Sequence, residues 1–338
     1  MTADVRSRVL LPSPDLDAGP VSCVAGLRPR RKGGYRLEMT RLDSKFLIHN
    51  YGHGGSGITM SWGCAEEVRE LALASGLHAE STPVAVIGAG VMGLTTATLL
   101  VEAGFTTTLY ARETFLATTS IISGGPWSPS LVDHDTSPAG TEEFERILRR
   151  AFRAHERRIG CGFGVERRDL YTMAPSENVA KVPRDVVAEP ERLSRLPFEN
   201  LNVPGCRYST LLIEPPIMLA RLEKDLHSAG ARVVQRCFRS LGDVAALTEP
   251  IVVNCTGLGS KELWPDSRLA ALKGHLAILP PQPRLEYLFS DSRYYVFPRN
   301  DCVVIGGTYT WETDPTPHMD VCHQLILEAK KLFGRAAN

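Results

Sequence analysis

A glycine-rich segment between a predicted strand and a predicted helix constrains this chain more than any other feature. Gly88, Gly90 and Gly93 follow an apolar run at residues 84–87 and precede a helical pattern that extends to residue 103. Gly104 then matches a helix stop, and residues 106–110 form a second strand-like run. A strand–helix–strand unit is the context in which the order Gly-x-Gly-x-x-Gly indicates a dinucleotide-binding fold.

The chemistry predicted for this turn is phosphate binding. Gly88 allows a tight turn, Gly90 lets a pyrophosphate approach the backbone, and Gly93 lets the helix pack against the strand. The helix N-terminus then offers N–H groups and a positive dipole end to the phosphates. An acidic residue about 20 positions further on is suited to a ribose hydroxyl. We therefore expect cofactor contacts from Gly88, Gly90, Val91, Met92, Gly93, Arg112 and Glu113. The glycines alone do not distinguish NAD from FAD.

Composition limits the partners and the location. The chain has 338 residues, with 38 Lys and Arg against 38 Asp and Glu, so its net charge is near zero. Binding to nucleic acid or to a membrane surface needs clustered positive charge, and we expect neither partner. The sequence shows no apolar signal core and no membrane-spanning run, which favours a cytoplasmic protein. The eight cysteines form no CxxC pair and no zinc spacing, so we expect reduced core thiols and no metal.

The remaining periodicities predict an α/β fold. Helical patterns occur at residues 58–73, 217–229 and 319–335, and strand-like runs at 233–238 and 251–255. Residues 272–310 alternate like antiparallel strands, residues 140–210 mix charged helices with Pro-rich turns, and residues 1–20 lack periodicity. The predicted fold class is a Rossmann-like parallel dinucleotide sheet interleaved with a mixed or antiparallel substrate-domain sheet.

Several ordered motifs elsewhere in the chain give a family resemblance. They are GLRP at residues 26–29, HNYGHGGSGIT at 49–59, TTS at 118–120 with GPW at 125–127, VNCTG at 253–257, YVFP at 295–298 and GGT at 306–308. Together they resemble the D-amino-acid oxidase family of FAD enzymes. In that family the glycine fingerprint opens the sequence and the GLRP and HNYGHGG blocks close it. Here the closing blocks come first, so the chain resembles a circularly permuted member.

The resemblance implies a discontinuous FAD-binding domain and a substrate domain. Residues 21–74, 83–140 and 230–270 would form the FAD-binding domain, and residues 141–229 and 271–310 the substrate domain. Residues 75–82 would be a linker that joins the exchanged segments, and residues 311–338 a C-terminal helical region. Chain ends that lie close together at the surface make such an exchange tolerable.

The resemblance also implies roles for individual residues. Arg28 would bind the substrate carboxylate, Tyr295 would hydrogen-bond the same group, and the Gly55 carbonyl would accept from the amine. His53 would be structural, because the family uses no histidine base. FAD, bound non-covalently, would also contact Gly54, Ser56, Gly57, Ile58, Thr59, Thr118, Thr119, Ser120, Gly125, Phe238, Thr256 and Gly257.

The implied activity is oxidative deamination of a D-amino acid. The Cα–H would pass as hydride to the flavin N5, the imino acid would hydrolyse to a keto acid and ammonia, and O₂ would reoxidise the flavin and yield H₂O₂. The expected partners are an amino acid or amine and O₂, and the oligomeric state stays open, a homodimer included. Alternatives are oxidation of glycine or another amine in a biosynthetic pathway, a flavin-binding protein without turnover, and an NAD-dependent dehydrogenase.

Two departures from the family pattern leave the substrate open. Mammalian members carry a second active-site tyrosine where this chain has Asp291. The family's Arg-Gly-Gln turn is Lys273-Gly274-His275 here. If Asp291 faces the pocket, its charge would disfavour an acidic substrate side chain.

Overall fold

The smaller of two β-sheets contains the nucleotide-binding unit in a computed structural model that describes residues 10–291 and 293–334. Its strand order is β2–β3–β10–β4–β5–β9. All neighbours are parallel except β2 and β3. The bounds are β2 Arg36–Leu42, β3 Lys45–Tyr51, β10 Ile251–Asn254, β4 Pro83–Ile87, β5 Thr106–Ala111 and β9 Arg232–Gln235.

Helices cover both faces of this sheet. Its central strands, β4 and β10, are apolar on both faces and are buried by this cover. One face packs in a single core with α1 Gly57–Leu73, α2 Val91–Glu102, α3 Pro138–Glu156 and α5 Pro215–Ser228. The other face packs against α6 Leu241–Ala245 and α7 Ser260–Leu263. The start of α3 shows how sequence sets a helix boundary: Ser137 accepts a hydrogen bond from the Gly140 N–H, and Pro138 occupies the first turn.

The larger sheet has nine strands among the described residues and is mostly antiparallel. Its order is β1–β11–β14–β13–β12–β6–β8–β7, and β15 also pairs with β11. The bounds are β1 Ser22–Arg31, β11 Leu269–Leu279, β14 Val303–Gly306, β13 Tyr295–Pro298, β12 Tyr287–Ser290, β6 Val165–Thr172, β8 Gly205–Ile213, β7 Glu191–Leu193 and β15 Thr310–Trp311. Helix α8 Met319–Phe333 packs on one face through a second apolar core, and α4 Glu177–Ala180 follows β6.

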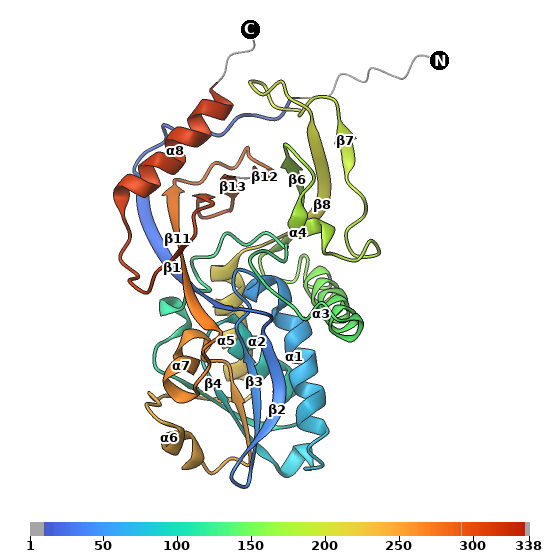
Figure 1. Ribbon diagram of the computed structural model, residues 1–338, viewed down its shortest axis with the longest axis vertical. Coiled ribbons are helices and arrows are strands. Elements are labelled where there is room, and N and C mark those ends of the chain that lie inside the picture. Colours follow the sequence, from blue (N-terminus) through green and yellow to red (C-terminus); the bar gives the residue numbers. More distant parts are fainter. Residues whose placement is uncertain (1–9, 292, 335–338) are drawn as a thin grey trace.

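The N-terminal segment contributes strands to both sheets: β1 to the larger one, and β2 and β3 to the smaller one. Figure 1 shows β1 and β11 running side by side from the upper part of the molecule toward the lower sheet. Strand β3 lies between β2 and β10, and β10 in turn pairs with β4, the strand before the glycine turn. Trp62 and Val68 of α1 share one core with Val84 and Leu94 from beyond residue 82. Residues before 74 and after 83 therefore form one folded body.

This architecture confirms the predicted fold class, an α/β fold with a parallel dinucleotide sheet and a mixed second sheet. The parallel strand–helix–strand unit appears as β4, α2 and β5. The strand expected at 233–238 is shorter, since β9 ends at Gln235 and Phe238 turns back into a core under the sheet. The boundaries of the two domains stay a prediction. Of the irregular segment at 1–20, residues 1–9 lie outside the described residues.

One expectation was wrong. Cys23 and Cys322 form a disulfide across 299 residues of sequence, with their Cα atoms 5.9 Å apart. The first turn of α8 packs on the sheet beside the beginning of β1, which brings the two residues together. Because this contact joins elements at opposite ends of the chain, the spacing of cysteines in the sequence gave no sign of it. Cys64, Cys161, Cys206, Cys237, Cys255 and Cys302 are free thiols.

Candidate active site

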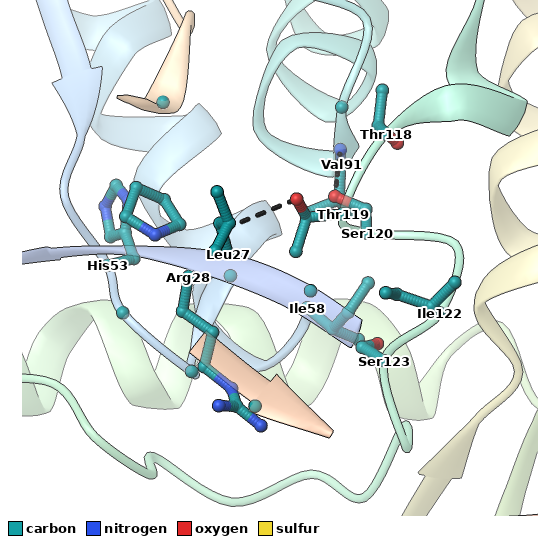
Figure 2. A pocket seen from close by; sticks show the side chains of 18 of the residues that line it. Leu27, Arg28, His53, Ile58, Val91, Thr118, Thr119, Ser120, Ile122 and Ser123 are labelled. Carbon is teal, nitrogen blue, oxygen red and sulfur yellow. Dashed lines mark hydrogen bonds between the residues drawn. The ribbon is translucent and has the colours of Figure 1, made fainter. Parts of the chain in front are cut away.

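A large cavity lies where the two sheets meet. Its volume is about 1140 Å³, and residues of both sheets and of the N-terminal segment line it. Figure 2 shows part of this lining, with Arg28 leaving β1 and Thr119 and Ser120 lying near the strand. Thr119 donates to the Leu27 carbonyl at 3.3 Å, and the Val91 N–H donates to the Ser120 hydroxyl at 3.1 Å. These two bonds hold the 118–120 loop between β1 and the start of α2.

The glycine turn leaves an open backbone surface at one end of the cavity. Gly88 has a φ of 115°, and a Cβ there would collide with the Cys255 carbonyl. A Cβ at Gly93 would collide with the Gly88 carbonyl. Gly90 differs, because an added Cβ would meet only the Ser120 hydroxyl, at 3.4 Å. Gly90 provides no side-chain cap for helix α2, and Ser120 accepts only from the Val91 N–H, so the next N–H groups of the first turn remain available to a ligand. This cradle fits a pyrophosphate.

The predicted cofactor residues converge on the cavity with two exceptions. Gly93 and Ser56 do not line it: Gly93 packs helix against strand, and the Ser56 hydroxyl donates to the Ser130 carbonyl at 2.8 Å. The residues that do line it are Gly54, Gly55, Gly57, Ile58, Thr59, Gly88, Gly90, Val91, Met92, Arg112, Glu113, Thr118, Thr119, Ser120, Gly125, Phe238, Thr256 and Gly257. Helix α1 also begins at this wall without a side-chain cap, and so directs a second helix N-terminus at the cavity.

Arg28 and Tyr295 lie together at the other end. The expected Lys-Gly-His turn is instead the middle of β11, where Gly274 pairs with Gly26 of β1. A Cβ at Gly274 would collide with the Arg28 guanidinium, so this glycine provides the space that the side chain occupies. Arg28 Nη1 lies 3.5 Å from the Thr308 carbonyl. Burial raises the pKa of the Tyr295 hydroxyl, and the hydrogen bond with Arg28 opposes that rise. A Cβ at Gly306 would collide with the same hydroxyl.

Arg28 lacks an acidic partner within the described chain. The neighbouring arginines of the same strand both have one: Arg30 pairs with Asp133 at 2.9 Å, and Arg31 with Asp266 at 2.7 Å. A half-buried guanidinium in a cavity needs an anion to offset its lost hydration. The site is therefore suited to a carboxylate, which a guanidinium can bind through two parallel hydrogen bonds.

His53 lies at the cavity wall but is poorly placed as a base. Its ring is buried, stacks on Tyr35 at 5.1 Å, and lies 3.4 Å from the Cys64 sulfur. Desolvation lowers the pKa of His53 to about 3, so the ring stays neutral at physiological pH. Its position agrees with a structural role.

Sequence reasoning missed part of the cavity wall. Arg236 contributes to it, with its guanidinium 4.7 Å from the Phe238 ring. Tyr309, Pro315 and Pro317 also line the cavity, from the segment before α8. In the sequence, only the closeness of Arg236 to Phe238 could have suggested that Arg236 lines the cavity. No local sequence feature indicates that Tyr309, Pro315 and Pro317 line it. Asp291 faces the cavity and forms an ion pair with Arg293 at 3.6 Å.

A dinucleotide cradle that opens into a cavity containing a half-buried arginine is typical of a nucleotide-dependent oxidoreductase. Comparison with known proteins is more specific. Residues 83–338 match the family described as "FAD dependent oxidoreductase" (DAO), and the chain belongs to that family. The match begins at β4, so residues 1–82 lie outside it.

Individual relatives agree with this family. The chain is 28% identical to a D-amino-acid oxidase of Streptomyces coelicolor over 252 residues, 70% of this chain and 73% of that protein. It is 31% identical to a D-amino-acid oxidase of Rubrobacter xylanophilus over 249 residues, 69% and 72% of the two chains. The fold resembles glycine oxidase from Bacillus cereus, with a TM-score of 0.55 at 15% identity over 75% of this chain and 78% of that one.

The cofactor is accordingly FAD. The cavity agrees with it, since the pyrophosphate cradle lies at one end and α1 and α2 both begin at its wall without a cap from the side chain of their N-cap residue. Among the described residues, no group of three or more His, Cys, Asp or Glu side chains is arranged to hold a metal ion. Within the same residues, no helix has both the length and the apolar character needed to cross a membrane.

Proposed function

We propose that the protein oxidatively deaminates a D-amino acid and passes the electrons to O₂. The observation that carries this proposal is Arg28, a half-buried cation without an acidic partner among the described residues, held in the cofactor cavity beside the Tyr295 hydroxyl. The D configuration is supported by two relatives whose names specify D-amino-acid oxidases.

Three groups would position the substrate. Arg28 would bind the carboxylate in a bidentate manner, and Tyr295, which stays protonated because burial raises its pKa, would donate a further hydrogen bond to it. The carbonyl of Gly55, which lines the same cavity, would accept from the amine. Contacts at two ends fix the orientation of the Cα–H bond, and such positioning lowers the barrier without a protein base. When bound, FAD would supply the two-electron acceptor.

The substrate side chain is expected to be neutral. Asp291 lines the cavity as an ion pair with Arg293, and a second carboxylate from the substrate would have to compete for that arginine. This reasoning favours neutral D-amino acids over D-aspartate, although a human D-aspartate oxidase is 26% identical over 68% of this chain.

A substrate panel tests the proposal. The purified protein would be supplied with D- and L-amino acids, glycine and simple amines, and H₂O₂ release measured for each. Neutral D-amino acids should give the highest kcat/KM. Preference for glycine or for an L-amino acid would overturn the assignment while leaving a flavin oxidase, and a yellow protein without peroxide or electron-acceptor activity would point to lost turnover.

We also propose that FAD is held non-covalently. His53 is enclosed, and burial raises the pKa of the Cys255 thiol to about 12, so neither is a ready nucleophile toward the flavin ring. Acid precipitation should leave the yellow colour in the supernatant. Colour that sediments with the protein would show a covalent bond.

The order of the chain is proposed to be a circular permutation of the family's order. Support comes from the family match, which begins at residue 83, and from β1, β3 and α1, which complete the two sheets and the cavity wall from the other end of the sequence.

A further inference from the structure

A solvent-exposed segment crosses the substrate end of the cavity. Residues 309–318, here called the strap, are exposed throughout. Tyr309, Pro315 and Pro317 nevertheless line the cavity that holds Arg28. Two aromatic side chains stand out at its surface, because Tyr309 is 60% and Trp311 63% exposed. The strap therefore forms part of the wall of the substrate site, although none of its residues is buried.

Few contacts hold the first half of the strap. Its only strand, β15, pairs two residues with β11. Glu312 forms an ion pair at 3.1 Å with Lys273, whose side chain is fully buried, and Arg30 lies 5.6 Å from the Trp311 ring. A segment with so few buried contacts opens more readily than the sheet beneath it.

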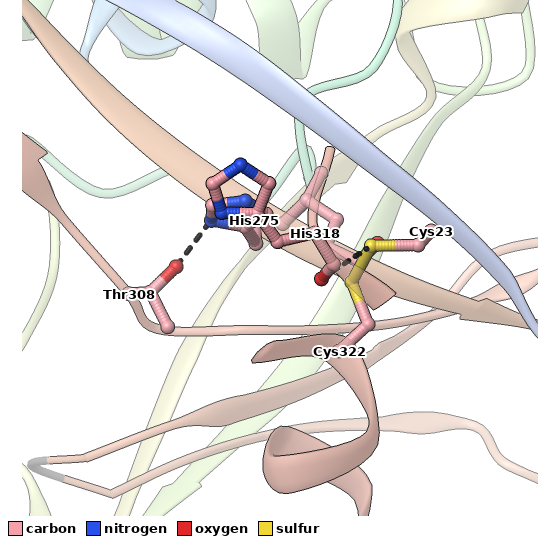
Figure 3. Close-up of a disulfide and its surroundings, with 6 residues drawn as sticks. Cys23, His275, Thr308, His318 and Cys322 are labelled. Carbon is pink, nitrogen blue, oxygen red and sulfur yellow. Dashed lines mark hydrogen bonds between the residues drawn. A yellow bond between two sulfur atoms is a disulfide. The ribbon is translucent and has the colours of Figure 1, made fainter. Parts of the chain in front are cut away.

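The second half depends on the Cys23–Cys322 disulfide. The strap ends at His318, directly before α8, and Cys322 lies in the first turn of that helix. Figure 3 shows the disulfide close to His318, with His275 and Thr308 nearby. Cys23 lies at the beginning of β1, five residues before Arg28, and β1 is an edge strand with β11 as its single neighbour in the sheet.

We propose that this disulfide is a redox-sensitive anchor for the strap and the beginning of β1, and that its reduction weakens binding of the substrate carboxylate. The inference rests on the proposed function in that Arg28 is taken as the carboxylate ligand. In the oxidised protein one covalent bond fixes both the C-terminal end of the strap and the strand that bears Arg28. In the reduced protein the covalent link to β1 is lost. The strap is then held by non-covalent contacts only, namely β15, the Glu312 ion pair, the Trp311 and His318 ring contacts and the packing of α8, and the substrate end opens more often.

The surroundings of the two sulfurs suit both redox states. Cys23 is half-buried and lines the cavity, whereas Cys322 is buried, so an incoming thiolate would attack the Cys23 sulfur. Cys23 Sγ lies 3.3 Å from the His318 carbonyl oxygen, and Cys322 Sγ lies 3.4 Å from that of Leu276. After reduction, each new S–H has an acceptor in place, so the reduced pair leaves no unsatisfied polar group.

The redox steps balance as follows. A dithiol supplies two electrons and two protons, the S–S bond breaks, two thiols form, and the dithiol itself becomes a disulfide. In the reverse direction, H₂O₂ oxidises one thiol to a sulfenic acid and releases one water. The second thiol then displaces hydroxyl from that sulfur, which forms the S–S bond and a second water. Because H₂O₂ is a product of the proposed reaction, turnover itself can restore the anchor.

The test compares the oxidised and phosphine-reduced holoenzyme after removal of the phosphine, which takes up oxygen from water as it reduces the bond. Benzoate binding is followed through the flavin absorbance, and hydrogen exchange of the strap by mass spectrometry. If the closed population falls to about a third, the apparent Kd for benzoate rises about threefold. Exchange at residues 309–318 should accelerate, KM should rise more than kcat falls, and H₂O₂ should reverse all three changes.

Two variants sharpen the comparison. Cys23→Ser should show the reduced-state Kd and exchange rate under all conditions, since it cannot form the bond and leaves Cys322 with its acceptor. Cys161→Ser removes an exposed free thiol and should respond as the wild type does. Equal Kd and equal strap exchange in both redox states, with reduction verified by a gain of two thiols, would overturn the inference, as would failure of H₂O₂ to form the bond. If neither state binds benzoate, the proposed function fails, and the exchange rates still decide whether the anchor exists.

Discussion

At the scale of single residues, Arg28 differs from the two other arginines of its strand by having no acidic partner among the described residues. Replacing it with alanine should lower kcat/KM by the equivalent of about 2–4 kcal/mol, mostly through KM, because a charge-assisted bidentate contact is lost. FAD content should stay near that of the wild type, since the nucleotide cradle lies at the other end of the cavity.

Steady-state kinetics and the flavin-to-protein absorbance ratio measure the two effects separately. The control is Arg195→Ala, which removes an exposed arginine two residues after the end of β7. Wild-type kcat/KM in Arg28→Ala would show that the carboxylate binds elsewhere. A loss of FAD equal to the loss of activity would show that Arg28 supports the cofactor rather than the substrate.

Buried histidines predict how stability responds to acid. Desolvation lowers the pKa of His155 to about 3, against 6.5 in the unfolded chain, so the unfolded state binds a proton first as the pH falls. The stability from this residue is complete above pH 6.5 and is lost between pH 6.5 and 3. From pH 7 to pH 5 the loss is on the order of 2 kcal/mol.

Urea unfolding of wild type and His155→Gln at both pH values checks this prediction. Glutamine keeps a donor for the Ile58 carbonyl, which the His155 ring contacts at 3.0 Å, but it does not titrate. The variant should therefore lose less stability on acidification, while exposed His78→Gln should follow the wild type. The same slope in all three proteins would contradict a neutral buried His155.

At the scale of elements, the glycine turn contains one glycine that folding requires, Gly93, and another that cofactor binding requires, Gly90. Gly90→Val should fold with near-normal stability and lose FAD, because the new side chain meets little protein but fills the space above the start of α2. Gly93→Val, the matched control, should fail to fold, since its side chain collides with the Gly88 carbonyl. Circular dichroism and flavin content distinguish the two. A Gly90→Val protein that retains FAD would show that the pyrophosphate does not bind at this turn.

Elements defined by local pattern could be predicted from the sequence, and those defined by distant packing could not. Val84 to Ile87, the glycine turn and α2 lie within one short stretch, so apolar periodicity and glycine spacing determine them. The end of β9 at Gln235 depends on where Phe238 packs beneath the sheet. The strap and the disulfide arise where α8 meets β1, and no local pattern records that contact.

At the scale of the whole molecule, the same contrast applies to the candidate site. Arg28, Gly55 and Tyr295 come from three distant stretches, and periodicity alone could not have placed them together. Their family motifs could, because each motif is specific and its order in the chain is informative. Pro315 and Pro317 belong to no motif, and only the folded structure places them in the cavity wall.

If the chain order is a permutation, the junction at residues 75–82 is a connection and not a source of chemistry. Gly76 is exposed, and an added Cβ there would meet nothing within 4 Å. A protease site inserted after Gly76 should therefore be cut in the folded protein, and the two pieces should stay together with FAD, because β3 remains between β2 and β10 and α1 remains packed on α2. Size-exclusion chromatography and flavin absorbance measure both properties.

A rearranged gene tests the order itself. A chain that begins at residue 83 and carries residues 1–74 after residue 338 should bind FAD and keep kcat/KM within a few-fold of the wild type, because every strand pairing of the two sheets is retained. Folding would change more than function, since β1 and α8 would meet early through a short connection instead of late across 299 residues. A rearranged protein that folds but cannot bind FAD would show that the cavity depends on the present order, and the permutation proposal would then be wrong.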